Sequence, residues 1–124
     1  MNNANPVGWF DIHVSNLERA KKFYETVFNM KLVDLPIEWG KQSFFPFNNE
    51  SPNISGALVE KVDRSANGNN TIVYFETEDC TTEESRIEKA GGKVVQSKIS
   101  IGNFGFTAIF IDTEGNTIGL HSRK

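Results

Sequence analysis

The side chains best suited to chemistry stand close together near the N-terminus, in a stretch of alternating polar and apolar residues. Residues 9–14 read W-F-D-I-H-V, so an extended strand would present Trp9, Asp11 and His13 on one face and apolar side chains on the other. An imidazole two residues from a carboxylate supports acid–base chemistry, and an indole offers a flat surface on which a ligand can stack. Function is therefore expected on the face that carries these three side chains.

The same alternation in two later predicted strands adds six positions to the expected cavity lining: Ile72, Tyr74, Glu76, Thr117, Gly119 and His121. We predict that the ligand is bound by Trp9, Asp11, His13, Tyr74, Glu76 and His121. The catalytic candidates among them are His13, Glu76 and His121, because their side chains can hold or move a proton. Each of these residues also has an ordinary role open to it, either in packing or as a solvated surface group.

A helix must follow the first strand and cover its apolar face. Ser15 and Glu18 have the spacing of a capping box, and apolar residues then recur at helical intervals up to Asn29. Strand and helix share one apolar interface, which leaves the face with Trp9 free for another use.

The second half of the chain repeats the order of elements in the first. Both halves are predicted as βαβββ, with one module over about 6–62, a polar linker over 63–70 and a second module over about 71–124, all in a single domain. Further strands are expected at 31–38 (interrupted at Pro36), 41–47, 54–62, 71–77, 93–101, 104–112 and 117–122, with a loop at 48–53 and a second helix at 81–90.

Composition excludes several classes of function. A net charge of −3 without a basic stripe argues against nucleic acid as a partner. The single cysteine, Cys80, cannot form an internal disulfide, and the N-terminal residues contain neither a basic leader nor an apolar run. We expect a cytoplasmic protein that does not insert into a membrane.

Four sequence segments resemble the vicinal oxygen chelate superfamily, which includes glyoxalase I, bleomycin-resistance proteins and extradiol dioxygenases. They are V-S-N-L-E-R-A-K-K-F-Y-E-T-V-F at 14–28, E-D-C at 78–80, K-A-G-G-K-V at 89–94 and D-T-E-G-N-T-I-G-L at 112–120. The opening W-F-D-I-H-V is similar to a branch of glyoxalase-related predicted enzymes. The resemblance implies an α+β fold in which two tandem βαβββ modules form an open barrel of the glyoxalase and bleomycin-resistance type.

The resemblance also implies where metal-using relatives hold their ion. Counted from the helix starts and the last strands, the four ligand positions fall on Trp9, Gly56, Ile72 and Gly119. None of these side chains can coordinate a metal, whereas a divalent ion needs at least three converging protein donors. We therefore predict no metal site and no cofactor, with Gly56 and Gly119 widening the cavity floor.

The sequence thus predicts a metal-free glyoxalase-like protein that binds a small organic molecule in a concave groove. Binding, sequestration and metal-independent chemistry all fit this prediction, so whether the protein is an enzyme stays open. A homodimer is expected, because each module exposes an unfinished sheet. Two alternatives are a metal-dependent lyase, isomerase or dioxygenase with nonstandard ligands, and a non-catalytic domain for protein association.

Overall fold

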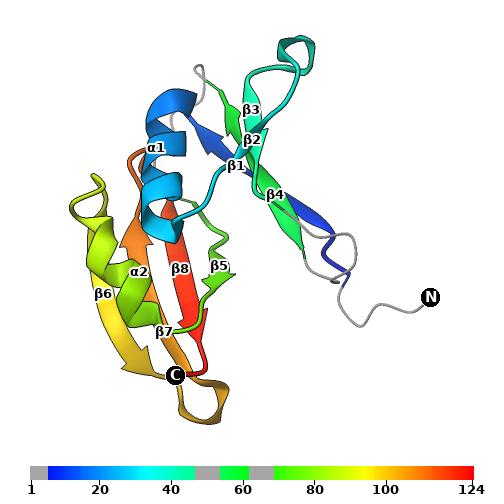
Figure 1. The fold of residues 1–124 in the computed structure, drawn as a ribbon. Coiled ribbons are helices and arrows are strands. Elements are labelled where there is room, and N and C mark those ends of the chain that lie inside the picture. Colours follow the sequence, from blue (N-terminus) through cyan, green and yellow to red (C-terminus); the bar gives the residue numbers. More distant parts are fainter. Residues whose placement is uncertain (1–5, 47–53, 62–68) are drawn as a thin grey trace.

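The computed structural model describes residues 6–46, 54–61 and 69–124, and in this part of the chain two βαβββ modules follow one another (Figure 1). The first module contains β1 (Trp9–Val14), α1 (Leu17–Phe28), β2 (Val33–Asp34), the short 3-10 helix η1 (Ile37–Trp39), β3 (Gln42–Phe44) and β4 (Ser55–Glu60). The second contains β5 (Val73–Glu76), α2 (Cys80–Ile87), β6 (Lys93–Ser100), the 3-10 helix η2 (Gly102–Phe104), β7 (Phe106–Ile111) and β8 (Thr117–Ser122). Neither described α-helix has the length and apolarity that crossing a membrane requires.

Each module forms its own four-stranded sheet with the same strand order. The orders are β1-β4-β3-β2 and β5-β8-β7-β6, with the first pair parallel and the others antiparallel. The predicted α+β fold with two tandem βαβββ modules is therefore confirmed, and neither sheet closes into a barrel. The predicted loop at 48–53 and most of the predicted linker at 63–70 lie outside the described residues.

The main departure from the predicted elements lies at residues 31–38. Only Val33–Asp34 is a strand there, and Pro36 precedes η1. A proline has no amide hydrogen for the sheet, and the 3-10 helix turns the chain back toward β3.

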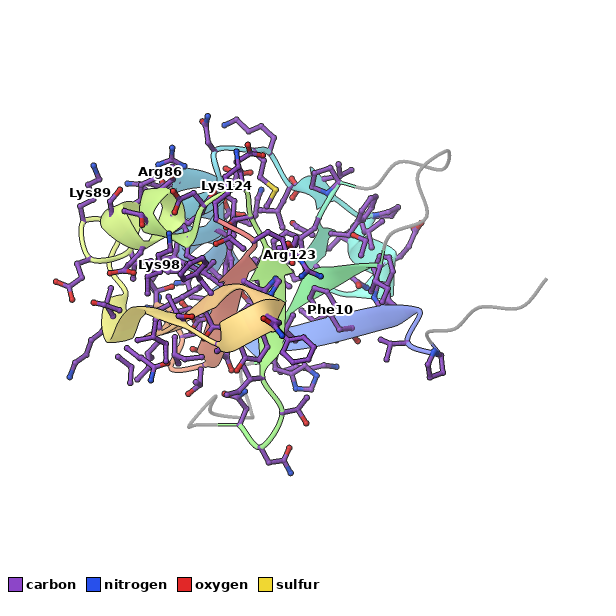
Figure 2. The ribbon with its side chains drawn as sticks, turned by 90° about the horizontal axis from the view of Figure 1, so that it is seen from below. Phe10, Arg86, Lys89, Lys98, Arg123 and Lys124 are labelled. Carbon is purple, nitrogen blue, oxygen red and sulfur yellow. The ribbon has the colours of Figure 1, made fainter. Side chains whose placement is uncertain are left out.

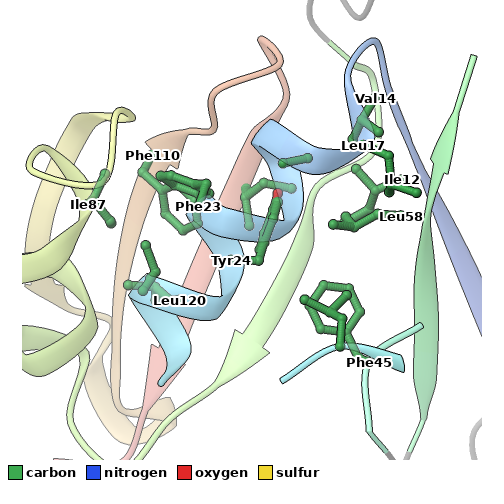
Figure 3. Packing of buried hydrophobic residues seen from close by; sticks show 14 of the residues in the cluster. Ile12, Val14, Leu17, Phe23, Tyr24, Phe45, Leu58, Ile87, Phe110 and Leu120 are labelled. Atoms are coloured by element: carbon green, nitrogen blue, oxygen red, sulfur yellow. The ribbon is translucent and has the colours of Figure 1, made fainter. Parts of the chain in front are cut away.

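Both modules turn their helix-covered faces toward one shared core. Side chains from α1, such as Phe23 and Tyr24, pack between residues of the two sheets, including Leu58 and Phe110 (Figure 3). The ring centroids of Phe10 on β1 and Phe75 on β5 are 6.0 Å apart, so these two edge strands also meet through their core-facing side chains. The opposite faces of the two sheets therefore point away from the common core.

Helix α1 begins differently from the prediction. The N-cap is Asn16, whose Oδ1 accepts a hydrogen bond from the Arg19 amide at 3.0 Å, so the predicted capping box from Ser15 to Glu18 is wrong. Ser15 is instead bound to Glu114, to which both its amide and its hydroxyl donate at 3.0 Å. The helix ends as predicted, at Asn29 in the left-handed conformation.

The turn between β7 and β8 locks the second module onto the first. Asp112 is buried and accepts hydrogen bonds from the Tyr24 hydroxyl at 2.6 Å and from the amides of Glu114 and Asn116 at 2.8 Å. Asn116 in turn donates from Nδ2 to the His13 carbonyl at 3.0 Å. Burial and the neighbouring Asp112 carboxylate raise the pKa of Tyr24 well above its ordinary value, so its hydroxyl keeps its proton and remains a donor.

Glu114 carries the charge of this contact. Burial alone raises the pKa of its carboxyl, but hydrogen bonds from Arg19, Thr113, Ser15 and the Asn16 amide outweigh that effect and lower the pKa to about 2. The Arg19 Nε lies 2.7 Å from Glu114 Oε2, and the Glu114 side chain is fully shielded from solvent. The carboxylate is thus buried, ionised and surrounded by donors.

We predict that Glu114→Gln lowers the free energy of unfolding by about 3 kcal/mol near neutral pH, because a pKa depressed from 4.5 to about 2 favours the folded, ionised state. A depressed carboxyl pKa stabilises the fold above 4.5, and this contribution disappears as pH falls toward about 2. Urea unfolding of the wild type and the variant over this range should therefore show the difference between them shrinking with acidity.

Glu18→Gln is the matched control, because Glu18 is an exposed carboxylate in the first turn of the same helix. Its effect should stay within about 0.5 kcal/mol. An equal loss in both variants would show that Glu114 contributes no more to the free energy of unfolding than an exposed carboxylate does.

Candidate functional site

The outward face of the first module carries Trp9, Asp11 and His13, as the strand alternation predicts. Ile12 and Val14 are buried on the other side of β1, while Trp9 is 46% exposed and His13 is half-buried. The register of the sheet adds Phe44 of β3 and Ala57 of β4 to this side, which we call the first-module face.

Trp9 is held in place by its neighbours on the first-module face. Its indole Nε1 donates to Asp11 Oδ1 at 3.1 Å, and its ring centroid lies 6.4 Å from that of Phe44. Asp11 therefore positions the indole of Trp9 and does not orient His13. The imidazole of His13 has no hydrogen-bond partner among the described residues. His13 is left as the side chain on this face with a free acid–base group.

The outward face of the second module, which we call the second-module face, carries the six predicted positions. Tyr74 and Glu76 lie on β5, Ile72 directly precedes that strand, and Thr117, Gly119 and His121 lie on β8. The parallel pairing places Tyr74 beside Gly119 and Glu76 beside His121. The core-facing residues between them include Phe75 and Leu120. This face is lined further by Ile99 and Thr107 of the neighbouring strands β6 and β7.

Tyr74 fills the space above Gly119. A Cβ at position 119 would collide with Cδ2, Cε2 and Cγ of the tyrosine ring, so only glycine lets the ring lie against β8. Gly119 therefore does not widen the floor as expected from the sequence, because Tyr74 covers it. The ring stays 49% exposed and presents its other side outward.

His121 makes close contacts through both ring nitrogens. Nδ1 lies 2.6 Å from Glu76 Oε1, and Nε2 lies 2.6 Å from the carbonyl oxygen of Phe104. The bond to the Phe104 carbonyl and then the bond to Glu76 raise the pKa of His121, which favours the imidazolium. Glu76 is thus partnered with His121.

The predicted ligand-binding residues lie on two surfaces of one chain. Trp9, Asp11 and His13 share the first-module face, and Tyr74, Glu76 and His121 share the second-module face. Because both sheets turn their other sides to the common core, the two faces do not enclose one groove within a single chain. Their role in ligand binding remains a prediction.

One of the four residues named for the family ligand positions, Gly56, does not lie on an outward face. Gly56 pairs with Phe10 and lies on the core side of β4, where a Cβ would collide with the Phe10 ring and carbonyl. The residue beside Asp11 on the outward side is Ala57, which also has no donor atom for a metal. Within the described ranges, no group of three or more His, Cys, Asp or Glu side chains has a metal-binding arrangement.

Two contributors to the faces were missed by the sequence analysis. Phe44 stands next to Phe45, so alternation alone does not decide which of the two points outward; the register with β4 decides it. The Phe104 carbonyl belongs to the backbone, and no residue type marks it as the partner of His121.

Several of the chain's basic side chains lie around α2 and the C-terminus (Figure 2). Arg86 donates to the Val27 carbonyl at 2.9 Å, Lys98 pairs with Asp79 at 2.9 Å, and Lys124 pairs with Glu78 at 2.9 Å. These three cations are each paired or hydrogen-bonded within the molecule.

With this geometry in view, sequence comparison identifies the family. Residues 7–120 match the model of the Glyoxalase/Bleomycin resistance protein/Dioxygenase superfamily, and the chain belongs to this superfamily. The resemblance inferred from the sequence is thereby confirmed. A comparison with curated proteins gave no significant match.

Solved structures with the same fold include proteins described in different functional terms. A glyoxalase/bleomycin resistance protein from Albidiferax ferrireducens T118 is 19% identical with a TM-score of 0.76, covering 96% of this chain and 100% of that one. An antibiotic-binding protein from Streptomyces sp. CB03234 is 24% identical with a TM-score of 0.71 (99% and 100% covered). A fosfomycin resistance protein from Listeria monocytogenes is 16% identical with a TM-score of 0.70 (97% and 94% covered).

We predict that Gly119→Ala lowers the free energy of unfolding by about 1–3 kcal/mol, because the new methyl group meets the Tyr74 ring. In a Tyr74→Ala background the same change should cost at least about 1 kcal/mol less, and a double-mutant cycle measured by urea unfolding gives this coupling.

Gly8→Ala is the control, since a Cβ at Gly8 meets no atom within 4 Å. A coupling near zero between positions 74 and 119 would contradict the packing of Tyr74 on Gly119.

Proposed function

We propose that the protein binds a small organic molecule without a metal, in a groove that forms when the first-module face of one copy meets the second-module face of another. The observation that carries this proposal is the outward direction of both faces. Each holds half of the predicted ligand-binding residues and is open to solvent. The cytoplasmic location predicted from the sequence remains part of the proposal.

The exposed apolar side chains on both faces support the proposal that another protein surface covers them. Trp9 is 46% exposed and Tyr74 49% exposed, and Ile72 and Ile99 on the second-module face are also exposed. Covering such side chains contributes about 25 cal/mol for each Å² of apolar surface removed from water. A second copy can cover both faces at once. In a twofold dimer the first-module face of each copy meets the second-module face of its partner.

The sheet edges point to the same arrangement. Strands β1 and β5, which carry the two faces, each have a strand neighbour on one side only. The edge of β6 is protected, because Glu84 Oε1 and Glu88 Oε2 of α2 accept hydrogen bonds from the Lys98 and Val94 amides at 2.8 and 3.3 Å. Edges blocked by side chains resist pairing with another chain. The remaining edge strand, β2, is only two residues long, so β1 and β5 are the better candidates for contact between copies.

The side chains indicate binding through shape, stacking and hydrogen bonds. The Trp9 indole N–H is already bonded to Asp11, so this partly exposed side chain would contribute to a ligand through ring contact and not through its donor. His121 has both nitrogens engaged, which leaves His13 as the free imidazole for hydrogen bonding or proton transfer. The antibiotic-binding relative supports the binding class, and turnover lost in His13→Ala would move the protein to the metal-independent enzymes.

A mixing experiment tests the shared groove. Trp9→Ala and Tyr74→Ala should each weaken binding by about 1–3 kcal/mol, measured with the hydrophobic dye ANS or with a small molecule retained in native mass spectrometry. When the two variants are mixed and exchange subunits, about half of the dimers pair one copy of each variant. Each mixed dimer has one intact groove, so about a quarter of the sites should regain full affinity.

The outcomes of mixing separate the alternatives. No recovery would place the whole site within one chain and contradict the shared groove. Normal binding by both single variants would remove the two rings from the site. A wild-type protein that retains no small molecule would instead favour a domain for protein association.

Elemental analysis of the purified wild-type protein tests the metal-free part of the proposal. We expect less than one transition metal ion for every ten chains, because the family ligand positions carry no donor atoms. A stoichiometric metal that resists dialysis would instead favour a metal-dependent enzyme with nonstandard ligands.

A further inference from the structure

A tight turn lies over one end of the second-module face. Residues 101–105, which we call the strap, link β6 to β7 and contain η2, with positive φ angles of 72° at Gly102 and 107° at Gly105. The strap closes on itself through the Ile101 amide, which donates to the Gly105 carbonyl at 2.8 Å. Its Phe104 side chain is 71% exposed, so burial of that ring does little to hold the strap down.

His121 joins the strap to the sheet. Its Nε2 lies 2.6 Å from the Phe104 carbonyl, and its Nδ1 lies 2.6 Å from Glu76 Oε1. A carbonyl oxygen and a carboxylate oxygen only accept hydrogen bonds, so both ring nitrogens must carry hydrogen for both bonds to form. Neutral imidazole has one N–H, and its other nitrogen would then turn a lone pair toward an oxygen.

The geometry points to a proton-dependent strap: the doubly protonated His121 ring holds residues 101–105 against the end of the second-module face, and loss of one proton releases them. While the strap is closed, it occupies the ring edge of His121, which stands in one row of the sheet with Thr107 and Ile99. Release therefore opens this end of the face. The inference concerns the protein without ligand and does not depend on what the groove binds.

The charges around His121 agree with this assignment. Glu76 faces it from β5, and Arg123 lies two residues further on, directly after β8. The neighbour of His121 on β7 is the uncharged Thr107, and the strap contains no charged residue. The Phe104 carbonyl and Glu76 raise the pKa of His121, outweighing the smaller lowering by desolvation and Arg123. A raised histidine pKa means that the closed strap is stabilised below the ordinary value of 6.5 and loses this support as pH rises through the higher, folded value.

Nuclear magnetic resonance of the ¹⁵N-labelled protein, titrated from mildly acidic to alkaline pH, tests the inference. The ring nitrogens of His121 should titrate with a midpoint above 6.5. Over the same range the hydrogen-exchange protection of the Ile101 amide, corrected for the intrinsic pH dependence of exchange, should fall. Linkage requires a tenfold loss of protection for every unit by which strap closure raises the pKa.

Two variants serve as matched controls. His121→Gln keeps a donor for the Phe104 carbonyl but does not titrate, so protection of Ile101 should no longer depend on pH. Glu76→Gln removes the charge beside Nδ1 and should lower the His121 midpoint. A midpoint at or below 6.5 in the wild type, or the same fall in protection in His121→Gln, would overturn the proton-dependent strap, and neither result would bear on the shared groove.

Discussion

The fold depends on one buried carboxylate contact between the modules. Glu114 and Asp112 lie in the turn between β7 and β8, and their oxygens accept hydrogen bonds from the start of α1 and from Tyr24 within it. Buried ionised groups are costly unless every oxygen is satisfied, and here the donors outnumber the oxygens. This requirement fixes how the second module sits on the first.

The functional consequences follow from that docking. The helices and the core-facing side chains of both sheets pack into one common core. The opposite faces of the sheets, which carry Trp9 and Tyr74, must therefore point outward. One chain therefore supplies two half-surfaces, and a groove that uses both needs a second copy. The same turn holds His13 in place, since Asn116 of the turn bonds the His13 carbonyl.

Much of this architecture could be predicted from sequence, because the signals are local. Alternation fixed which side chains of β1 and β8 face outward, and apolar spacing with Asn29 fixed the end of α1. What could not be predicted depends on residues distant in the chain. Ser15 has the spacing of a cap, but its partner Glu114 stands 99 positions later, and the offset of one residue that turns Gly56 inward comes from the register between β1 and β4.

The candidate site shows the same contrast between local signals and contacts made by residues distant in the chain. The six predicted side chains are outward-facing because strand alternation is local, but their separation onto two faces follows from how the modules pack. The role of His121 also depends on packing, since its partner in the strap is a backbone carbonyl 17 positions away. Residue type alone would make His121 and His13 equivalent, whereas only the His13 ring is without a partner in the described part of the chain.

Sedimentation equilibrium at micromolar concentration tests most directly whether a single chain is an incomplete binding unit. The account predicts a mass twice that of the 13.9 kDa chain. A mass equal to one chain, in a preparation that still binds its ligand stoichiometrically, would contradict it.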